Sequence, residues 1–449
     1  MAKRISAPGN TPTNCESPTA QGGGAPGSPQ WRAAALIAIG VTLLLLHLTN
    51  PHVGLYYGRY ESAYYVSSVD RPLQGGVVVD MTTGDSAPAP VGIDPHYGYR
   101  LLPPLLVKVL PVEHSLGFVI LDYVFLFGAA YLLYAILVHG RIRYDLCILC
   151  SIVLIILPFS TKWMLFYSAG PDPLHVFNIA AAYRCIQLRK WLLFSFILMV
   201  GTLTKETIWL MWVVALIYGV DAKYLTHWRA WLNHARILTI IPSLLVFSLI
   251  RFVWPADSTG YAYLVDIYNN IYRLHIQSTM WPHVLPQAVE IPASFFLVYG
   301  VIGIISIYNW RRSIQILQNH PAMLLFLVGS MVASVIGSVD LERCMFYHAI
   351  PVLYVFARVV QEQWVFFRQW QVAVPVVAAQ AYMSDLVRWN MVDYERTYSA
   401  HYMGPTAALH QLVVVASAAL LVVALRTWFG KRDHAEHRNA GAERMDVAL

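Results

Sequence analysis

Long apolar runs constrain this chain more than any other feature of its sequence. Four examples are residues 33–48, 116–138, 237–253 and 412–425. Because a helix rises about 1.5 Å per residue, runs of this length approach or exceed what crosses a hydrocarbon core of roughly 30 Å. Strands of a membrane barrel would alternate apolar and polar residues, and these runs do not alternate. The sequence therefore predicts an all-α membrane protein.

The overall composition agrees with this prediction. Of 449 residues, 57% are hydrophobic and only 12% are charged, and the mean hydropathy is +0.51. Such a chain has too few polar side chains to cover the surface of a soluble fold. We therefore expect membrane lipid to surround most of the molecule, and we expect no nucleic-acid partner.

The apolar segments indicate about twelve transmembrane helices. Most of the 31 Lys and Arg residues fall in short loops on one side and in the two terminal segments. Positive residues in short loops stay on the cytoplasmic side, so both termini are expected in the cytoplasm. The predicted helices are 32–49, 116–138, 144–160, 173–188, 190–203, 206–220, 236–254, 291–308, 321–338, 344–360, 371–386 and 406–426.

The chain divides into a membrane domain and two tails. Residues 1–31 are rich in Gly, Pro, Ser and Thr with almost no large aliphatic residues, which predicts a disordered tail. The membrane domain is expected to cover 32–426, and 427–449 form a second tail on the cytoplasmic side. Two long loops, 50–115 and 255–290, face outward in this topology. Loops of such length are usually functional or have structure of their own.

Polar side chains gather at predicted outer helix ends. Asp172 opens the fourth helix, with His175 and Asn178 on the same face at i+3 and i+6. Lys205 and Glu206 lie between two apolar helices, where ionisable groups are costly and often functional. The simpler alternatives are a helix-capping role for Asp172 and a local Lys205–Glu206 ion pair that only ends a helix.

Two further candidates lie on the same side. Asp340 and Arg343 mark the start of the tenth helix, spaced i and i+3 so that they can pair directly. In the first outward loop, residues 58–69 can form an amphipathic helix at the interface, with tyrosines toward lipid and Glu61 toward the protein. An aromatic belt with a solvated acid is the alternative for that segment.

Four of the five cysteines are predicted to be small side chains packed in the core. Cys147 and Cys150 form a C-x-x-C inside an apolar helix without a second Cys or His pair, which predicts small core residues and not a metal or redox site. Cys185 and Cys344 are also expected in the core, and Cys15 falls in the first tail.

Several short stretches resemble bacterial relatives of the GT-C glycosyltransferases, in the same order along the chain. These stretches are 59–69, 97–106, 170–175, 203–207, and 340–343 with Pro351. The resemblance implies a GT-C-like fold with a long first outward loop. It also implies an enzyme of the bacterial inner membrane that moves a sugar from a polyprenyl-phosphate donor to a glycan or lipid acceptor on the outer face.

The resemblance implies roles for individual residues. An acid of the first outward loop lies near the reaction centre in that superfamily, which makes Glu61 the candidate general base. Basic residues of later outward loops hold the donor phosphate. The second catalytic candidate is Asp172, and the substrate-binding candidates are Arg100, His175, Lys205, Glu206, Asp340 and Arg343.

Some alternatives stay open. The superfamily usually has an Asp where this chain has Glu61, so Asp70, Asp94 and Asp172 are alternative bases. The scheme requires no cofactor, although the acids could hold a divalent metal. A transporter or flippase would need ionisable groups near the middle of helices and repeats between halves. A non-catalytic membrane scaffold is the third hypothesis.

Overall fold

The computed structural model describes residues 29–49, 65, 68–70, 77–78, 89–90, 100–157, 164, 170–220, 234–253, 284–337, 344–384 and 405–446. Its elements are α1 (Pro29–Thr49), β1 (Val77–Val78), β2 (Ala89–Pro90), α3 (Leu102–Lys108), α4 (His114–His139), α5 (Tyr144–Ile156), α7 (Asp172–Gln187), α8 (Trp191–Thr202), the 3₁₀ helix η2 (Glu206–Trp209), α9 (Leu210–Ile217), α10 (His234–Leu238), α11 (Ile241–Val253), α13 (Val284–Tyr308), α14 (Trp310–Asn319), α15 (Pro321–Gly337), the 3₁₀ helix η6 (Phe346–His348), α17 (Ala349–Glu362), α18 (Trp364–Phe367), α19 (Trp370–Met383) and α21 (Pro405–Asp446).

A helix lies at each of the twelve ranges that the apolar runs predicted. Among the described residues, five helices are long and apolar enough to cross a membrane, or six if α14 and α15 form one span bent by 113°. The protein is therefore a helical membrane protein with several spans, and the number twelve stays a prediction. The described residues also contain a two-stranded antiparallel ribbon, β1 with β2, which an all-α fold does not include.

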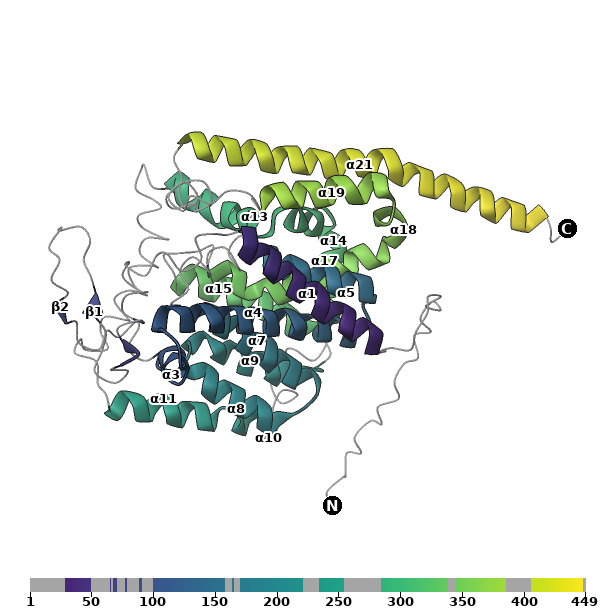
Figure 1. Cartoon of the computed structure of the whole chain (residues 1–449). Coiled ribbons are helices and arrows are strands. Elements are labelled where there is room, and N and C mark those ends of the chain that lie inside the picture. The colour runs from purple at the N-terminus through teal and green to yellow at the C-terminus, as the bar shows by residue number, and fades with distance from the viewer. Residues whose placement is uncertain are drawn as a thin grey trace, which may run out of the picture.

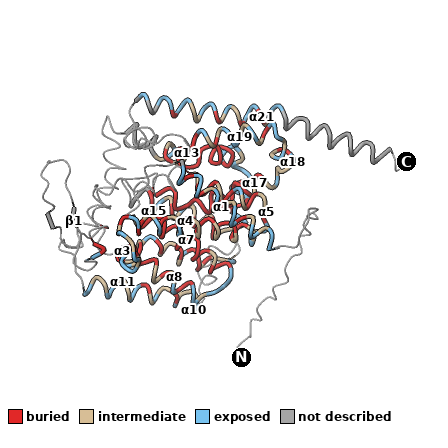
Figure 2. Tube along the Cα trace, viewed as in Figure 1, coloured by how far each residue is buried: buried red, intermediate tan, exposed pale blue. Residues whose placement is uncertain are grey.

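The helices pack into one bundle around α4 and α7 (Figure 1). Among the described elements these two helices share the most extensive interface, and α1, α5 and α8 pack around them. Buried apolar side chains such as Leu133, Ile179 and Leu353 form one continuous core, which Figure 2 shows in red along these helices. Cys147, Cys150, Cys185 and Cys344 lie in this core, as predicted.

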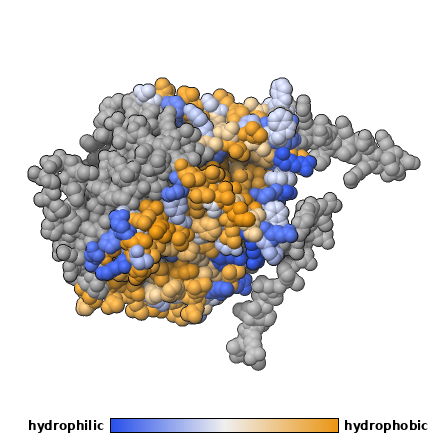
Figure 3. Space-filling view, in the orientation of Figure 1, coloured by the Kyte–Doolittle hydropathy of each residue, from blue (hydrophilic) through white to orange (hydrophobic). Residues whose placement is uncertain are grey.

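The outside of the bundle is apolar, as lipid contact requires. Leu192 is 88% exposed and Phe252 is 86% exposed. Figure 3 shows a broad belt of apolar residues across the visible face, with hydrophilic residues at its right-hand end and in a second group at its lower left. A soluble monomer rarely exposes so large a continuous apolar patch.

The structure describes little of the first predicted tail and most of the second. The disordered tail was predicted for 1–31, of which residues 1–28 lie outside the described residues. Helix α1 begins at Pro29, three residues earlier than predicted. At the other end, α21 does not stop at 426 but continues to Asp446 through most of the segment predicted as a tail.

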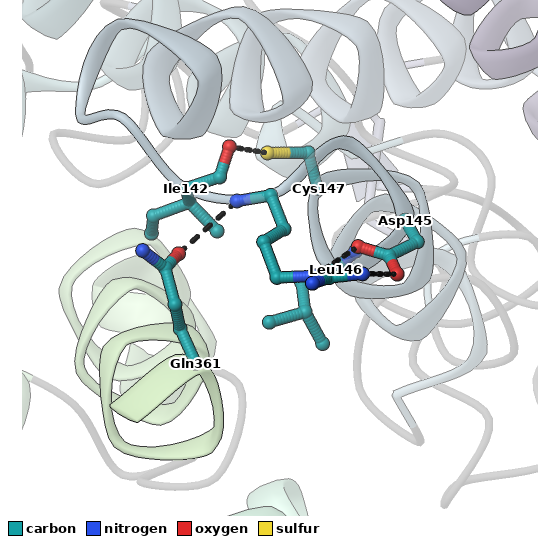
Figure 4. A network of polar contacts seen from close by, with 6 residues as sticks. Ile142, Asp145, Leu146, Cys147 and Gln361 are labelled. Atoms are coloured by element: carbon teal, nitrogen blue, oxygen red, sulfur yellow. Dashed lines mark hydrogen bonds and ion pairs between the residues drawn. The ribbon is translucent and has the colours of Figure 1, made fainter. Parts of the chain in front are cut away.

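The bundle has two ends that can be named by their residues. We call the end where α4, α7 and α17 begin the site end, and the opposite end, with the turns 140–143 and 188–190, the turn end. At the turn end, the Gln361 side chain of α17 forms two hydrogen bonds with the backbone of the first of these turns (Figure 4). Its Oε1 accepts a hydrogen bond from the Arg143 backbone N–H at 3.1 Å, and its Nε2 donates to the Arg141 carbonyl at 3.3 Å. These two hydrogen bonds join the last turn of α17 to the turn between α4 and α5.

Candidate functional site

Three polar side chains from distant parts of the chain meet at the site end. Asp172 is the first residue of α7, Lys205 immediately precedes η2, and Tyr347 lies in η6 just before α17. Asp172 and Lys205 lie where the helical chain is interrupted, before α7 and between α8 and η2, and Tyr347 lies in the short 3₁₀ helix that leads into α17. The packing of α7 against α8, η2 and α9 brings Asp172 and Lys205 together. Tyr347 joins them through hydrogen bonds to both.

The three side chains bond to one another. Lys205 Nζ donates to the Tyr347 hydroxyl at 2.7 Å and lies 3.4 Å from Asp172 Oδ1. The Tyr347 hydroxyl donates in turn to Asp172 Oδ1. The Lys205 and Asp172 side chains are only 11% and 6% exposed. This is a buried ion pair with a bridging phenol, and removing one charge of such a pair is strongly destabilising.

His175 and Asn178 follow Asp172 on the same face of α7 and are also buried. His175 is fully buried, its Nε2 lies 2.8 Å from Thr207 Oγ1, and its ring meets the Tyr347 ring edge-on with centroids 4.8 Å apart. Asn178 Nδ2 donates to Thr204 Oγ1 at 3.2 Å. The i, i+3, i+6 face expected from the sequence thus binds the segment that carries Lys205.

That segment is shaped by Gly201, near the end of α8. Its carbonyl accepts the backbone N–H groups of Thr204 at 2.9 Å and of Lys205 at 2.8 Å. Lys205 itself has extended backbone angles, φ −164° and ψ 131°. The fully buried Ile208 packs directly on Gly201, where a Cβ would lie 2.7 Å from Ile208 Cγ1. Only glycine leaves space for this close approach.

We therefore expect Gly201→Ala to lower the free energy of unfolding by about 1–3 kcal/mol, because the β-branched Ile208 side chain cannot move away. Thermal unfolding in detergent measures the change. The matched control is Gly40→Ala on α1, where the nearest atom to an added Cβ is 3.9 Å away. This control should unfold at the wild-type temperature or slightly above it. Equal melting temperatures for both variants would contradict the close-packing argument.

Arg100 approaches the site from the start of α3. The Leu102 backbone N–H donates to the Leu203 carbonyl at 3.1 Å, which ties α3 to the Lys205 segment. Arg100 Nη1 donates to the Tyr65 hydroxyl at 3.1 Å, and the Arg100 charge lies within electrostatic range of His175. The structure thus brings Arg100, Asp172, His175 and Lys205 to one region.

Glu206 belongs to a different contact. Its carboxylate lies 3.7 Å from Arg251 Nη2 of α11, and the two side chains are 24% and 37% exposed. The alternative of a local Lys205–Glu206 ion pair is therefore wrong, because Lys205 pairs with Asp172 instead. Asp172 likewise does more than cap a helix, since its carboxylate accepts bonds from two other segments.

Three of the predicted site residues lie outside the described residues, namely Glu61, Asp340 and Arg343. Within the residues that are described, no three His, Cys, Asp or Glu side chains gather in a way that could hold a metal ion.

Two residues of the site were missed by sequence reasoning. Tyr347 lies close behind the stretch 340–343 but carries no signal of its own. Asp122 of α4 is 3% exposed and interacts electrostatically with Asp172, and its Oδ2 has no hydrogen-bond partner among the described residues. A single acid inside an apolar run is by default a functional candidate in a membrane protein, and this signal could have identified Asp122.

Comparisons with known proteins add a likeness to solved structures and no sequence match. No family model matches the sequence, and no curated protein matches it. Among solved structures, the chain is similar to the oligosaccharyltransferase of Archaeoglobus fulgidus, crystallised with a tethered acceptor peptide that contains an NVT sequon. The TM-score is 0.49 at 13% sequence identity, and the match covers 89% of this chain and 55% of the archaeal one.

Proposed function

We propose that this protein is a GT-C-type glycosyltransferase that moves a sugar from a polyprenyl-phosphate donor to a glycan or lipid acceptor. The observation that carries the proposal is the buried Lys205–Tyr347–Asp172 cluster at the site end. The motif resemblance of the stretches around these residues gives the reaction class. A cationic group at a helix end suits a donor whose tail lies in the bilayer and whose phosphate lies at its surface.

Lys205 is the proposed ligand of the donor phosphate. An ammonium group carries three N–H donors, and within the described part of the chain two of them go to Tyr347 and Asp172. The cluster holds Nζ in one place before any ligand arrives. Arg100 supplies a second positive charge on the same side, and Arg343 is proposed as a third.

The reaction follows from these roles. Glu61 takes the proton of the acceptor hydroxyl as a general base, the acceptor oxygen forms a bond to the anomeric carbon, and the bond from that carbon to the phosphate oxygen breaks. The leaving phosphate gains negative charge, which Lys205 and Arg100 stabilise. Asp172 already accepts bonds from two donors, so its role is to orient Lys205.

The proposal includes the topology. Twelve spans with both termini in the cytoplasm put the turn end on the cytoplasmic side of a bacterial inner membrane and the site end on its outer face. The basic residues of the turn end, among them Arg141, Arg143 and Arg189, agree with this orientation.

Transport of a lipid or ion is the second candidate, and Asp122 favours it. A transporter needs ionisable groups inside its helices, and Asp122 lies eight residues into α4.

A vesicle assay tests both functions. Purified protein is reconstituted into liposomes with a polyprenyl-phosphate sugar carrying a labelled sugar, and acceptor-containing membrane extract is added. We expect protein-dependent release of polyprenyl phosphate together with labelled acceptor. Movement of the labelled lipid between leaflets without any product would overturn the transferase proposal in favour of transport.

A further inference from the structure

Helix α13 is broken at Gly300, in the interior of the bundle. Gly300 is buried and has φ 54° and ψ −133°, a backbone conformation that residues with a side chain rarely adopt. A Cβ at this position would also lie 2.9 Å from Oε1 of Gln380, which comes from α19. The backbone angles therefore require glycine, and the Gln380 side chain fills the space beside it.

Gln380 satisfies the backbone at this break. Its Oε1 accepts a hydrogen bond from the Ile302 backbone N–H at 3.3 Å, and its Nε2 donates to the Ser384 hydroxyl at 3.1 Å. Gln380 is 6% exposed, and Ser384 is fully buried. Within a membrane domain an unsatisfied backbone N–H is costly, because no water is available to bind it. The amide thus stabilises the break in one conformation.

Tyr299, immediately before the break, contacts the segment that carries Tyr347. It is fully buried, and its hydroxyl donates to the Met345 carbonyl at 2.6 Å. Met345 directly precedes η6, which contains Tyr347. The Tyr299 ring also lies beside the His348 ring, with centroids 5.9 Å apart. Tyr299 thus ties η6 to α13 through residues on both sides of Tyr347 in the chain.

Tyr347 needs support from its neighbours because η6 is only three residues long. A single 3₁₀ turn makes few hydrogen bonds of its own, so packing must fix its position. The Tyr347 hydroxyl meets Lys205 Nζ, at 2.7 Å, and Asp172 Oδ1 at once. A displacement of about half an ångström would lengthen these bonds beyond their favourable range. The contacts of Tyr299 with η6 therefore bear on the geometry of the whole cluster.

We propose that Tyr299 is a positioning residue of the candidate site, and that the break at Gly300, bridged by Gln380, aims its hydroxyl at η6. The inference rests on the proposed role of Lys205 as ligand of the donor phosphate. Tyr299 acts on that lysine through Tyr347, whose hydroxyl binds Nζ. A glycine and a buried amide inside the bundle cost stability compared with apolar residues, and a role in placing the site accounts for them.

Fluorine NMR of the full chain in detergent tests the proposal, with a ring-fluorinated tyrosine incorporated at position 347 as the probe. Its resonance reports the surroundings of the cluster phenol without any transfer reaction. Tyr299→Phe keeps the ring and removes the hydrogen bond to Met345, so we expect the resonance to shift or broaden. Gln380→Leu should do the same, because the backbone at the break loses its acceptor. Lys205→Ala removes a direct partner of the phenol and gives the reference shift.

The matched control is Tyr134→Phe, which removes a buried hydroxyl near the turn end of α4. Tyr134 is 2% exposed, and its hydroxyl has no hydrogen-bond partner among the described residues. This variant should leave the resonance at its wild-type position. An equal shift in Tyr134→Phe would show a general effect of losing a buried hydroxyl and overturn the proposal. An unchanged resonance in Tyr299→Phe would also overturn it.

Binding of polyprenyl phosphate to the unlabelled variants gives the functional consequence. We expect Tyr299→Phe to weaken it roughly three- to tenfold, the effect of one lost hydrogen bond, and Tyr134→Phe to bind like the wild type. Wild-type affinity in Tyr299→Phe, together with weak binding in Lys205→Ala, would overturn the positioning role while the proposed function stands. Wild-type affinity in Lys205→Ala would instead remove the proposed function, and the resonance alone would then decide whether Tyr299 places Tyr347.

Discussion

Replacing Lys205 with alanine is expected to remove most of the affinity for a polyprenyl-phosphate sugar and to destabilise the protein. The variant removes the lysine charge that pairs with the buried Asp172 carboxylate, which keeps its hydrogen bond from the Tyr347 hydroxyl. Removing one partner of a buried ion pair typically costs about 3–5 kcal/mol. The donor phosphate loses its positioned cation at the same time. Donor binding and thermal unfolding, both in detergent, measure the two effects separately.

The double variant Lys205→Ala/Asp172→Ala separates binding from stability. Removing both charges should recover much of the lost stability, whereas donor affinity should stay low. The matched control is Glu206→Gln, which breaks the more exposed pair with Arg251. It should cost no more than about 1 kcal/mol and leave donor binding unchanged. Unchanged donor affinity in Lys205→Ala would refute the role of this lysine.

The second large effect is expected in turnover. Glu61→Gln should lower the rate of sugar transfer by roughly a hundred- to ten-thousand-fold, as expected when a general base is lost, with donor affinity nearly unchanged. Single-turnover transfer and equilibrium donor binding, measured on the same preparation, distinguish the chemical step from binding.

Asp70→Asn is the control for this prediction. The Asp70 side chain is 73% exposed and lies 3.7 Å from His114 Nε2 at the start of α4, so its loss should leave turnover near the wild-type rate. Asp172→Asn should behave like Lys205→Ala, with weaker donor binding as its main effect. If Glu61→Gln transfers sugar at the wild-type rate, the base must be sought among the alternatives, of which Asp94 lies outside the described residues.

The helices of this protein could be predicted from sequence because apolar runs need only length and composition to be recognised. Their number as membrane spans is harder to predict. The helices α8 and α9 have 12 and eight residues, which is shorter than a bilayer crossing requires. The short ribbon β1–β2 gave no signal, since two-residue strands are too short for a periodic pattern.

The partners of the charged side chains in the candidate site could not be predicted from neighbouring residues in the sequence. Lys205 and Glu206 are neighbours in sequence, so a pair between them was the simplest alternative. The extended backbone of Lys205 and the 3₁₀ helix that starts at Glu206 direct the two side chains to different partners. Tyr347 could not be selected because nothing local distinguishes it from the other 26 of the chain's 27 tyrosines. Only tertiary packing shows that its hydroxyl bridges the ion pair.

Contacts with other segments hold helix α17 at both of its ends. Tyr347 at one end is held by the ion pair, and Gln361 at the other end is held by the turn 140–143. A shift of α17 along its axis would break contacts at both ends at once. The proposed donor therefore meets a cation that folding has already placed, and its binding energy need not be spent on ordering the site. A preorganised charge of this kind favours the departure of the phosphate without reorganisation at the moment of reaction.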